Sequence, residues 1–232
     1  MKDQYFGDVN DYVKYGLLKC CAESGWRVGV CWMLTRSDAR SDGRKIAYLS
    51  DSRGWRDHDP TLFDNLQTIV NGRDRRVAVA DAADIIPGAR YFDDPVPDSK
   101  DARSNWIERA LKTLSAADLL FFDPDNGVEI PSIPKGRKDS SKYVFWDEVE
   151  LGWKQGASLL IFQHFARQET RIEHVARLAL EMEARAPGST VTPLVTSNVL
   201  FLLASRPQHA DRAAATLDLL KTRWGSRFRL EG

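Results

Sequence analysis

The sequence predicts an α/β fold, in which helices cover both faces of a mostly parallel sheet with an antiparallel strand near the C-terminus. Two short apolar runs, Leu119–Phe122 and Ser158–Phe162, are typical of strands that are buried on both faces, as in a parallel sheet. Residues Thr190–Leu194 and Asn198–Ala204 read as two strands joined by three residues, which favours an antiparallel pair. The chain has 232 residues and is 43% hydrophobic, so we expect one α/β domain over 1–232.

The other elements follow from apolar spacing and from turn-forming residues. Val13, Leu17 and Leu18 form one apolar face of a helix that Gly25 ends. Pro60 suits the first turn of the next helix, and Pro187-Gly188 ends a later one. We expect helices over Asn10–Ser24, Thr61–Val70, Ser104–Leu114, Trp146–Lys154, Gln168–Arg185 and Pro207–Trp224, strands over Val28–Met33, Ile46–Leu49 and Val77–Val79, an irregular segment over Ile85–Asp101, and a long loop from the end of the Leu119–Phe122 strand through Lys142.

Composition narrows the class of protein. The 33 basic residues balance the 33 acidic ones, so net charge does not indicate an acidic or nucleic-acid partner, although a local basic patch is compatible with it. The three cysteines, Cys20, Cys21 and Cys31, are odd in number and are expected to be reduced thiols packed in the core. The polar N-terminus and the lack of a long apolar run predict a cytoplasmic protein without a membrane partner. The sequence does not indicate an oligomeric state.

The stretch Asp123-Pro124-Asp125-Asn126-Gly127 directly follows a predicted buried strand. Ligands of open α/β sheets bind at the carboxyl ends of the strands, and clustered carboxylates are costly to desolvate. We therefore expect Asp123, Asp125 and Asn126 to point into one small ligand-binding volume, with the proline and the glycine fixing the turn. The alternative is a purely structural Asx turn, which uses the same residue types.

A second candidate segment runs from Tyr5 to Gly16 and includes Asp8, Asp11 and Lys14. Asp8 or Asn10 is a suitable helix cap, and Asp11 and Lys14 have the spacing of a surface ion pair. These roles do not explain the four aromatic residues in the same segment. Aromatic rings beside polar groups suit a groove for a planar ligand.

Two further segments are candidates for substrate contact. The basic loop Lys135–Tyr143, with Ser141 and Lys142, suits phosphate contact or a mobile lid, although a solvated loop is the more common use of such residues. His164 follows the second buried strand and is a candidate base or ring contact, although a lone histidine is more often structural. Glu129, close after Asp123 in the chain, is a third candidate.

At these residues the chain resembles the Rossmann-fold S-adenosylmethionine-dependent methyltransferases, and most of all the 23S rRNA adenine-N6 methyltransferase of the J type. That type has a Gly-Asn-x-x-Asp-x-x-Lys-His element near its N-terminus, and Gly7, Asp11 and Lys14 match its glycine, aspartate and lysine. Asp123-Pro124-Asp125-Asn126 occupies the place of the Asp/Asn-Pro-Pro-Tyr motif. The strand pair within Thr190–Ala204 resembles the closing hairpin of that fold. The chain is also similar to a family of uncharacterised bacterial proteins that share YFGDxNDYxKYGLL and DPDNGxE.

The resemblance implies a Rossmann-like methyltransferase fold, S-adenosylmethionine as cofactor and a nucleobase exocyclic amine in RNA or DNA as target. It implies that Asp123, Asp125, Asn126 and Lys14 are catalytic, with Asp123 accepting hydrogen bonds from the amine. The cofactor would lie against Gly7, Asp8, Asp11, Lys14, Tyr15 and Trp32, and the substrate against Glu129, Ser141, Lys142 and His164. The chain departs from the family in three places: a charged Thr35–Arg44 segment replaces the glycine-rich loop, Tyr15 replaces histidine, and Asp125-Asn126 replaces Pro-Tyr.

Two alternatives stay open. Asp123, Asp125 and Glu129 have the ligand chemistry to hold Mg²⁺ in a metal-dependent phosphodiesterase or nuclease, with Lys138 or Lys142 beside the phosphate. The charged replacement of the glycine-rich loop instead favours a non-catalytic protein that retains the fold. S-adenosylmethionine would stabilise a methyltransferase, and Mg²⁺ would stabilise a metal-dependent enzyme.

Overall fold

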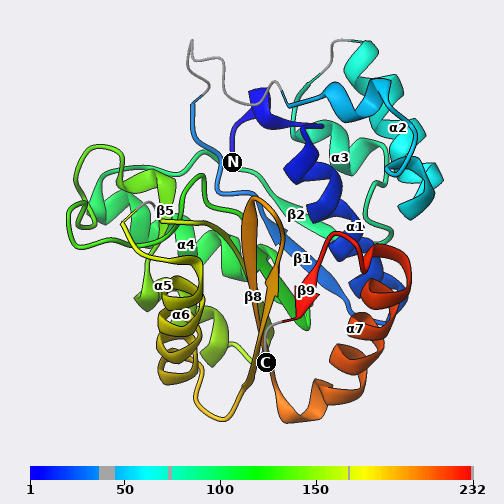
Figure 1. The fold of residues 1–232 in the computed structure, drawn as a ribbon. Coiled ribbons are helices and arrows are strands. Elements are labelled where there is room, and N and C mark those ends of the chain that lie inside the picture. Colours follow the sequence, from blue (N-terminus) through cyan, green and yellow to red (C-terminus); the bar gives the residue numbers. More distant parts are fainter. Residues whose placement is uncertain (37–44, 73–74, 167, 231–232) are drawn as a thin grey trace.

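A seven-stranded sheet forms the centre of the molecule in a computed structural model that describes residues 1–36, 45–72, 75–166 and 168–230 (Figure 1). The strand order is β2-β1-β3-β6-β8-β7-β9. Strands β2 (Arg90–Phe92), β1 (Val28–Cys31), β3 (Leu119–Phe122) and β6 (Ser158–His164) are parallel neighbours. Strand β8 (Val199–Ser205) is antiparallel to both β6 and β7 (Thr190–Val195), and the short β9 (Arg229–Leu230) is antiparallel to β7. The chain therefore has the expected α/β fold with a mostly parallel sheet.

Helices lie on both faces of the sheet (Figure 1). Helices α1 (Val9–Glu23), α2 (Pro60–Asn71), α3 (Ala78–Ala82) and α7 (Ala210–Trp224) contribute to the core on one face. Helices α4 (Lys100–Thr113), α5 (Trp146–Lys154) and α6 (Arg171–Arg185) contribute to the core on the other. Strand β3 supplies both cores, because Leu119 and Phe121 face the first and Leu120 and Phe122 the second.

Local sequence explains where the helices begin. The Asp8 carboxylate accepts hydrogen bonds from the amides of Asn10 and Asp11 and so caps α1. Pro60 occupies the first turn of α2, as expected. Gly16 lies where α1 meets α7, because a Cβ atom there would come within 2.1 Å of the Trp224 ring. Among the described residues, no helix has the length and apolar character to cross a membrane.

Most expected elements are present, and the bounds of α5 match the expected range. The antiparallel pairing of β7 with β8 is confirmed, and the three cysteines are buried free thiols. Three expectations are wrong. Val77–Val79 leads into helix α3, Ile46–Leu49 gives the 3-10 helix Ala47–Ser50, and the Ile85–Asp101 segment contains strand β2. In each case a run of three to four residues is too short to show whether its apolar pattern is that of a helix or of a strand. Packing against neighbouring elements then determines which structure forms.

The long segment after β3 also contains structure that the sequence did not indicate. Strand β4 (Gly127–Val128) pairs in parallel with β5 (Tyr143–Val144), and a 3-10 helix, Ser140–Lys142, precedes β5. Further 3-10 helices are formed by Asp3–Tyr5, Arg56–His58 and Pro207–His209. The β4–β5 pair holds the segment after Asp123 beside the carboxyl end of β6, where the amide of His164 donates to the Asn126 carbonyl oxygen at 3.2 Å.

Candidate functional site

A buried lysine connects α1 to the end of β3. The Lys14 ammonium nitrogen is 2.8 Å from Oδ1 of Asp11 and 2.8 Å from Oδ2 of Asp123. All three side chains are at most 3% exposed, so Asp11 and Lys14 form a buried ion pair rather than the surface pair that their spacing also allowed. The ammonium group also lies over the ring of Phe162, 4.9 Å from its centroid.

The charges of this cluster support one another. Burial alone would lower the pKa of Lys14, but the carboxylates of Asp11 and Asp123 outweigh it and raise the pKa above its usual value. Burial raises the pKa of Asp123, and the Lys14 ammonium opposes this shift without cancelling it. Asp11 is fully engaged, because its second oxygen accepts the Gly7 amide at 3.1 Å and the Tyr15 hydroxyl at 3.4 Å. Lys14 therefore remains a fixed positive charge beneath the site.

Asp125 is held from another direction. The amino group of Met1 lies 2.6 Å from its Oδ1 and also donates to the carbonyl oxygens of Met33 and Asp123, both at 3.0 Å. The Thr35 hydroxyl donates to Oδ2 of Asp125 at 2.5 Å. The Met1 nitrogen is thus surrounded by one carboxylate oxygen and two carbonyl oxygens. The edge of the sheet beyond β1 and β3 can therefore bind an N–H donor.

Asp8 is a buried carboxylate with spare hydrogen-bonding capacity. One oxygen, Oδ1, accepts the amides of Asn10 and Asp11 at 2.8 and 3.0 Å. Within the described part of the chain, Oδ2 has no hydrogen-bond partner. Burial and the neighbouring Asp11 raise the pKa of Asp8 to about 7. A bound cation or hydroxyl donor would relieve this cost of burial.

These groups surround a cavity of about 390 Å³ at the carboxyl ends of β3 and β6. Its wall combines carboxylates, the Lys14 ammonium and the rings of Tyr5 and Phe162. The size lies in the range of small-molecule pockets, and the place is where an open α/β sheet binds ligands. The predicted residues that line it are Asp8, Asp11, Lys14, Asp123, Asp125, Asn126 and His164.

Asn126 and His164 form a wall that this cavity shares with a larger one. Although part of His164 is exposed, desolvation of its ring and the positive charge of Lys14 lower its pKa, so its imidazole is neutral at neutral pH. The Asn126 side chain is half-buried and makes no hydrogen bond within the described part of the chain. Its amide can thus donate to one ligand group and accept from another.

Gln163 fixes this shared wall in place. Its Oε1 accepts the Val128 amide at 2.8 Å, and its Nε2 donates to the His164 carbonyl oxygen at 2.6 Å. Gly127 is required here, because its φ is +126° and a Cβ atom would lie 2.0 Å from Gln163 Oε1. The sequence showed Gln163 only as the last polar residue before His164, with no sign of this contact.

Three predicted substrate residues lie outside the smaller cavity. Glu129 lines the larger cavity and accepts the Trp146 amide at 3.2 Å. Lys142 is paired with Asp139 at 2.8 Å, and the amide of Ser141 donates to Asp98 at 2.7 Å. These local contacts satisfy the polar groups of the loop, so the structure does not bring Ser141 or Lys142 to Asp123.

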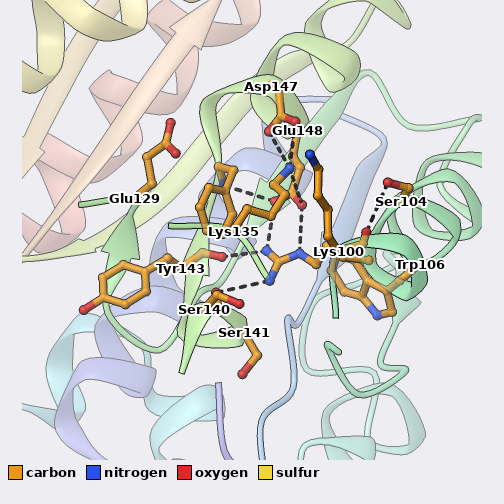
Figure 2. A network of polar contacts seen from close by, with 12 residues as sticks. Lys100, Ser104, Trp106, Glu129, Lys135, Ser140, Ser141, Tyr143, Asp147 and Glu148 are labelled. Carbon is orange, nitrogen blue, oxygen red and sulfur yellow. Dashed lines mark hydrogen bonds and ion pairs between the residues drawn. The ribbon is translucent and has the colours of Figure 1, made fainter. Parts of the chain in front are cut away.

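The first residue of the basic loop belongs to a buried network, which Figure 2 shows. Lys135 pairs with Asp147 at 2.6 Å and with Glu148 at 3.2 Å. Glu148 also binds the buried guanidinium of Arg103, Nε to Oε1, at 2.8 Å. Glu129 lies apart from this network in the same view (Figure 2). Lys135 is therefore already neutralised within the fold, which is neither the phosphate contact nor the solvated loop that the sequence suggested.

The aromatic residues of the N-terminal segment serve mainly as core. Phe6, Tyr12 and Tyr15 are fully buried, and only Tyr5 of the four lines the cavity. Trp32 is 1% exposed and packs against Tyr91 and Tyr15 instead of lining the cavity. Gly7 and Tyr15 are not among the described residues that line the cavity, and they donate hydrogen bonds to Asp11, which does line it. The expected aromatic groove is therefore wrong, because the helix turns these rings toward the sheet.

Among the described residues, no group of three or more histidine, cysteine or acidic side chains is arranged to hold a metal ion. Lys14 occupies the space between Asp11 and Asp123, and Glu129 is directed to the other cavity. Of the Thr35–Arg44 segment, residues 37–44 lie outside the described residues. Comparison with protein-family models, with curated proteins and with solved structures finds no match to this chain.

Proposed function

We propose that this protein is a Rossmann-like, S-adenosylmethionine-dependent methyltransferase that acts on an amine. The observation that carries the proposal is the contact between Lys14 and Asp123. The two segments that carry the resemblance, one around Lys14 and one at Asp123, are 109 residues apart and meet within 2.8 Å at one cavity. The antiparallel β8, placed between β6 and β7, supports the same fold.

The residues around the cavity fit this cofactor. S-adenosylmethionine supplies a methyl group bound to a positively charged sulfur. Of the four carboxylates that line the cavity, those of Asp11, Asp123 and Asp125 are already paired with Lys14 or with the Met1 ammonium, and Lys45 lines the cavity as well. Asp8 is the carboxylate left for the cofactor, because one of its oxygens has no hydrogen-bond partner among the described residues. Tyr5 and Phe162 add aromatic surface to the lining, which suits contact with a purine. The volume of about 390 Å³ suits a ligand of this size.

Each residue has a distinct task in this proposal. Asp8 accepts a hydrogen bond from the cofactor, and Lys14 holds Asp123 and Asp11 in fixed positions. Asn126 accepts a hydrogen bond from the target amine and so orients its lone pair. The neutral His164 beside it can accept a hydrogen bond from the amine. Catalysis would rest chiefly on positioning, which is consistent with the absence of a reactive nucleophile among the described lining residues.

A thermal-unfolding series with three ligands tests the proposal. We expect S-adenosylmethionine and S-adenosylhomocysteine to raise the melting temperature of the wild type, and Mg²⁺ not to raise it. A ligand at 100 times its dissociation constant stabilises the folded state by about 2.7 kcal/mol. Asn126→Ala should keep this stabilisation, because Asn126 is assigned to the substrate. Stabilisation by Mg²⁺ alone would favour the metal-dependent phosphodiesterase instead.

A further inference from the structure

The second cavity is a groove of about 1520 Å³ that begins at the shared wall of Asn126 and His164. It runs between the segment that follows β4 and one side of α6, along which the lining extends as far as Arg185. The smaller cavity alone would hold the proposed cofactor, so the groove is where the remainder of a substrate can lie. Its chemistry therefore indicates the class of molecule that carries the amine.

The charge of the described lining residues does not favour a polyanion. Its described lining residues include three carboxylates, from Glu129, Glu169 and Glu181, and two guanidinium groups. Arg177 is paired with Glu181 at 2.9 Å and with Glu169 at 2.7 Å. The second guanidinium, Arg185, is paired at 2.7 Å with Glu150, which lies outside the groove. Nucleic acid is bound through cations that are available to phosphate, and these two are already engaged.

Glu129 is the carboxylate on which the charge argument depends. The exposed Arg171 is not among the described lining residues, but its guanidinium lies at the rim of the groove, 4.6 Å from the ring centroid of Phe165. Glu129 accepts one backbone amide and has no lysine or arginine partner among the described residues. The described lining thus carries three carboxylates against two guanidinium groups, and Glu129, although within electrostatic reach of Arg185, has no ion-pair partner there, which favours a neutral or positively charged ligand.

A buried histidine in the same groove lacks a partner on one side. His174 is 2% exposed, and its Nδ1 lies 2.5 Å from Oε1 of Glu169. Its Nε2 is buried and has no hydrogen-bond partner among the described residues. An unsatisfied buried polar atom costs about 1 to 3 kcal/mol, so this nitrogen indicates a ligand or water that completes it. The Glu169 contact favours a proton on Nδ1, which leaves Nε2 to bind a polar group of a ligand.

The walls of the groove are apolar between these polar groups. Ile130 is 37% exposed, and Pro131, Pro134, Trp146 and Phe165 lie around it in the lining. Aromatic and aliphatic surface with a few fixed acceptors suits the side chains and backbone amides of a peptide. We propose that the groove binds a polypeptide segment of neutral or positive charge. That this polypeptide is the methyl acceptor rests on the proposed function. That the groove binds a polypeptide does not depend on it.

Binding measurements on a charge-reversal variant of the groove distinguish a peptide ligand from a nucleic-acid ligand. The probes are an array of random 12-residue peptides, acetylated and amidated, sorted by net charge, and a labelled random 12-nucleotide RNA. We expect the wild type to bind neutral and basic peptides, and Glu129→Arg to weaken this binding about tenfold. Glu183→Arg, on an exposed part of α6 that lines neither cavity, is the matched control and should have no effect. Ile130→Arg, at an exposed side chain of the same wall, repeats the test if Glu129→Arg lowers stability.

The opposite result would overturn the proposal. If the groove takes nucleic acid, the wild type will bind the RNA, and Glu129→Arg will tighten that binding and steepen its dependence on salt. Failure of every peptide to bind, or equal peptide binding by Glu129→Arg, Ile130→Arg and Glu183→Arg, would also overturn it. The cofactor is left out of these titrations. Peptide binding without any binding of S-adenosylmethionine would therefore refute the proposed function while leaving the peptide groove in place.

Discussion

Lys14 on α1 and Asp123 at the end of β3 form a buried ion pair, with Nζ and Oδ2 separated by 2.8 Å. Asp11 completes the cluster at the same distance from Lys14. This contact fixes the N-terminal helix against the carboxyl edge of the sheet and leaves the neighbouring Asp125, Asn126 and Asp8 around one cavity. The stability of the fold and the shape of the site therefore depend on the same three side chains.

Lys14→Met should destabilise the protein strongly at neutral pH. The substitution leaves two buried carboxylates without their cation, and breaking a buried pair in this way costs about 3 to 5 kcal/mol. The deficit should shrink as the pH is lowered, because the unpaired carboxylates then take up protons. Urea unfolding at pH 7 and pH 5 measures both effects. Lys154→Met, which removes a largely exposed partner of Glu150, is the control and should cost less than 1 kcal/mol. Equal losses in the two variants would contradict the account.

Asp8→Asn should become more stabilising, relative to the wild type, as the pH rises from about 4 to about 7. The folded protein raises the pKa of Asp8 from 3.8 to about 7, so in this window the folded state holds a proton that the unfolded state has lost. Wild-type stability from this group therefore falls with rising pH, by at most about 1.4 kcal/mol per pH unit. Asparagine keeps the helix cap without the charge. Urea unfolding from pH 4 to pH 8 checks this, and a difference independent of pH would contradict it.

Gly127→Ala should destabilise the protein more than Gly156→Ala does. Both glycines have positive φ angles, +126° and +103°, which strain an alanine by about 1 to 3 kcal/mol. Only at Gly127 does the new Cβ atom also meet Gln163, at 2.0 Å, whereas Gly156 faces open space. The difference between the two unfolding free energies therefore reports the contact that fixes the shared wall. No difference would mean that Gln163 can move away freely.

The three cysteines should resist alkylation in the folded protein. All are buried, and burial raises the pKa of Cys20 to about 11 and that of Cys31 to about 12. Iodoacetamide at pH 8 should modify none of them within an hour, and all three in urea, as counted by mass spectrometry. Rapid labelling of the native protein would contradict this burial.

The sequence alone predicts the fold well where its apolar pattern is clear. The strands that become β3 and β6 are predicted because each contains four consecutive apolar residues that are followed by polar ones, and α5 is predicted from its own apolar spacing. Strand β2 and helix α3 are missed because their residues show no clear apolar pattern and packing against neighbouring elements sets them. The charge spacing of Asp11 and Lys14 predicts a contact but not its burial, which depends on Asp123 far along the chain.

The sequence predicts the residues of the smaller cavity but not the contacts of the residues around it. The position of Asp123, Asp125 and Asn126 after a buried strand places them at the cavity, as the sheet geometry requires. Glu129 is only a few residues further along, yet the β4 strand carries it to the groove. The partners of Lys135 and Lys142, and the role of Gln163, arise from contacts that no local pattern contains.

Calorimetric titration of S-adenosylmethionine into the wild type and into Asp8→Asn at pH 8 tests the central claim most directly. We expect one binding site per chain in the wild type. Binding to Asp8→Asn should be weaker by a factor of about ten to one hundred, because a hydrogen bond to a charged group contributes about 1.5 to 3 kcal/mol. The Asn variant keeps the cap and should remain folded, so a weaker signal would report the site. No binding by the wild type, or equal affinity in both proteins, would contradict the assignment of this cavity to the cofactor.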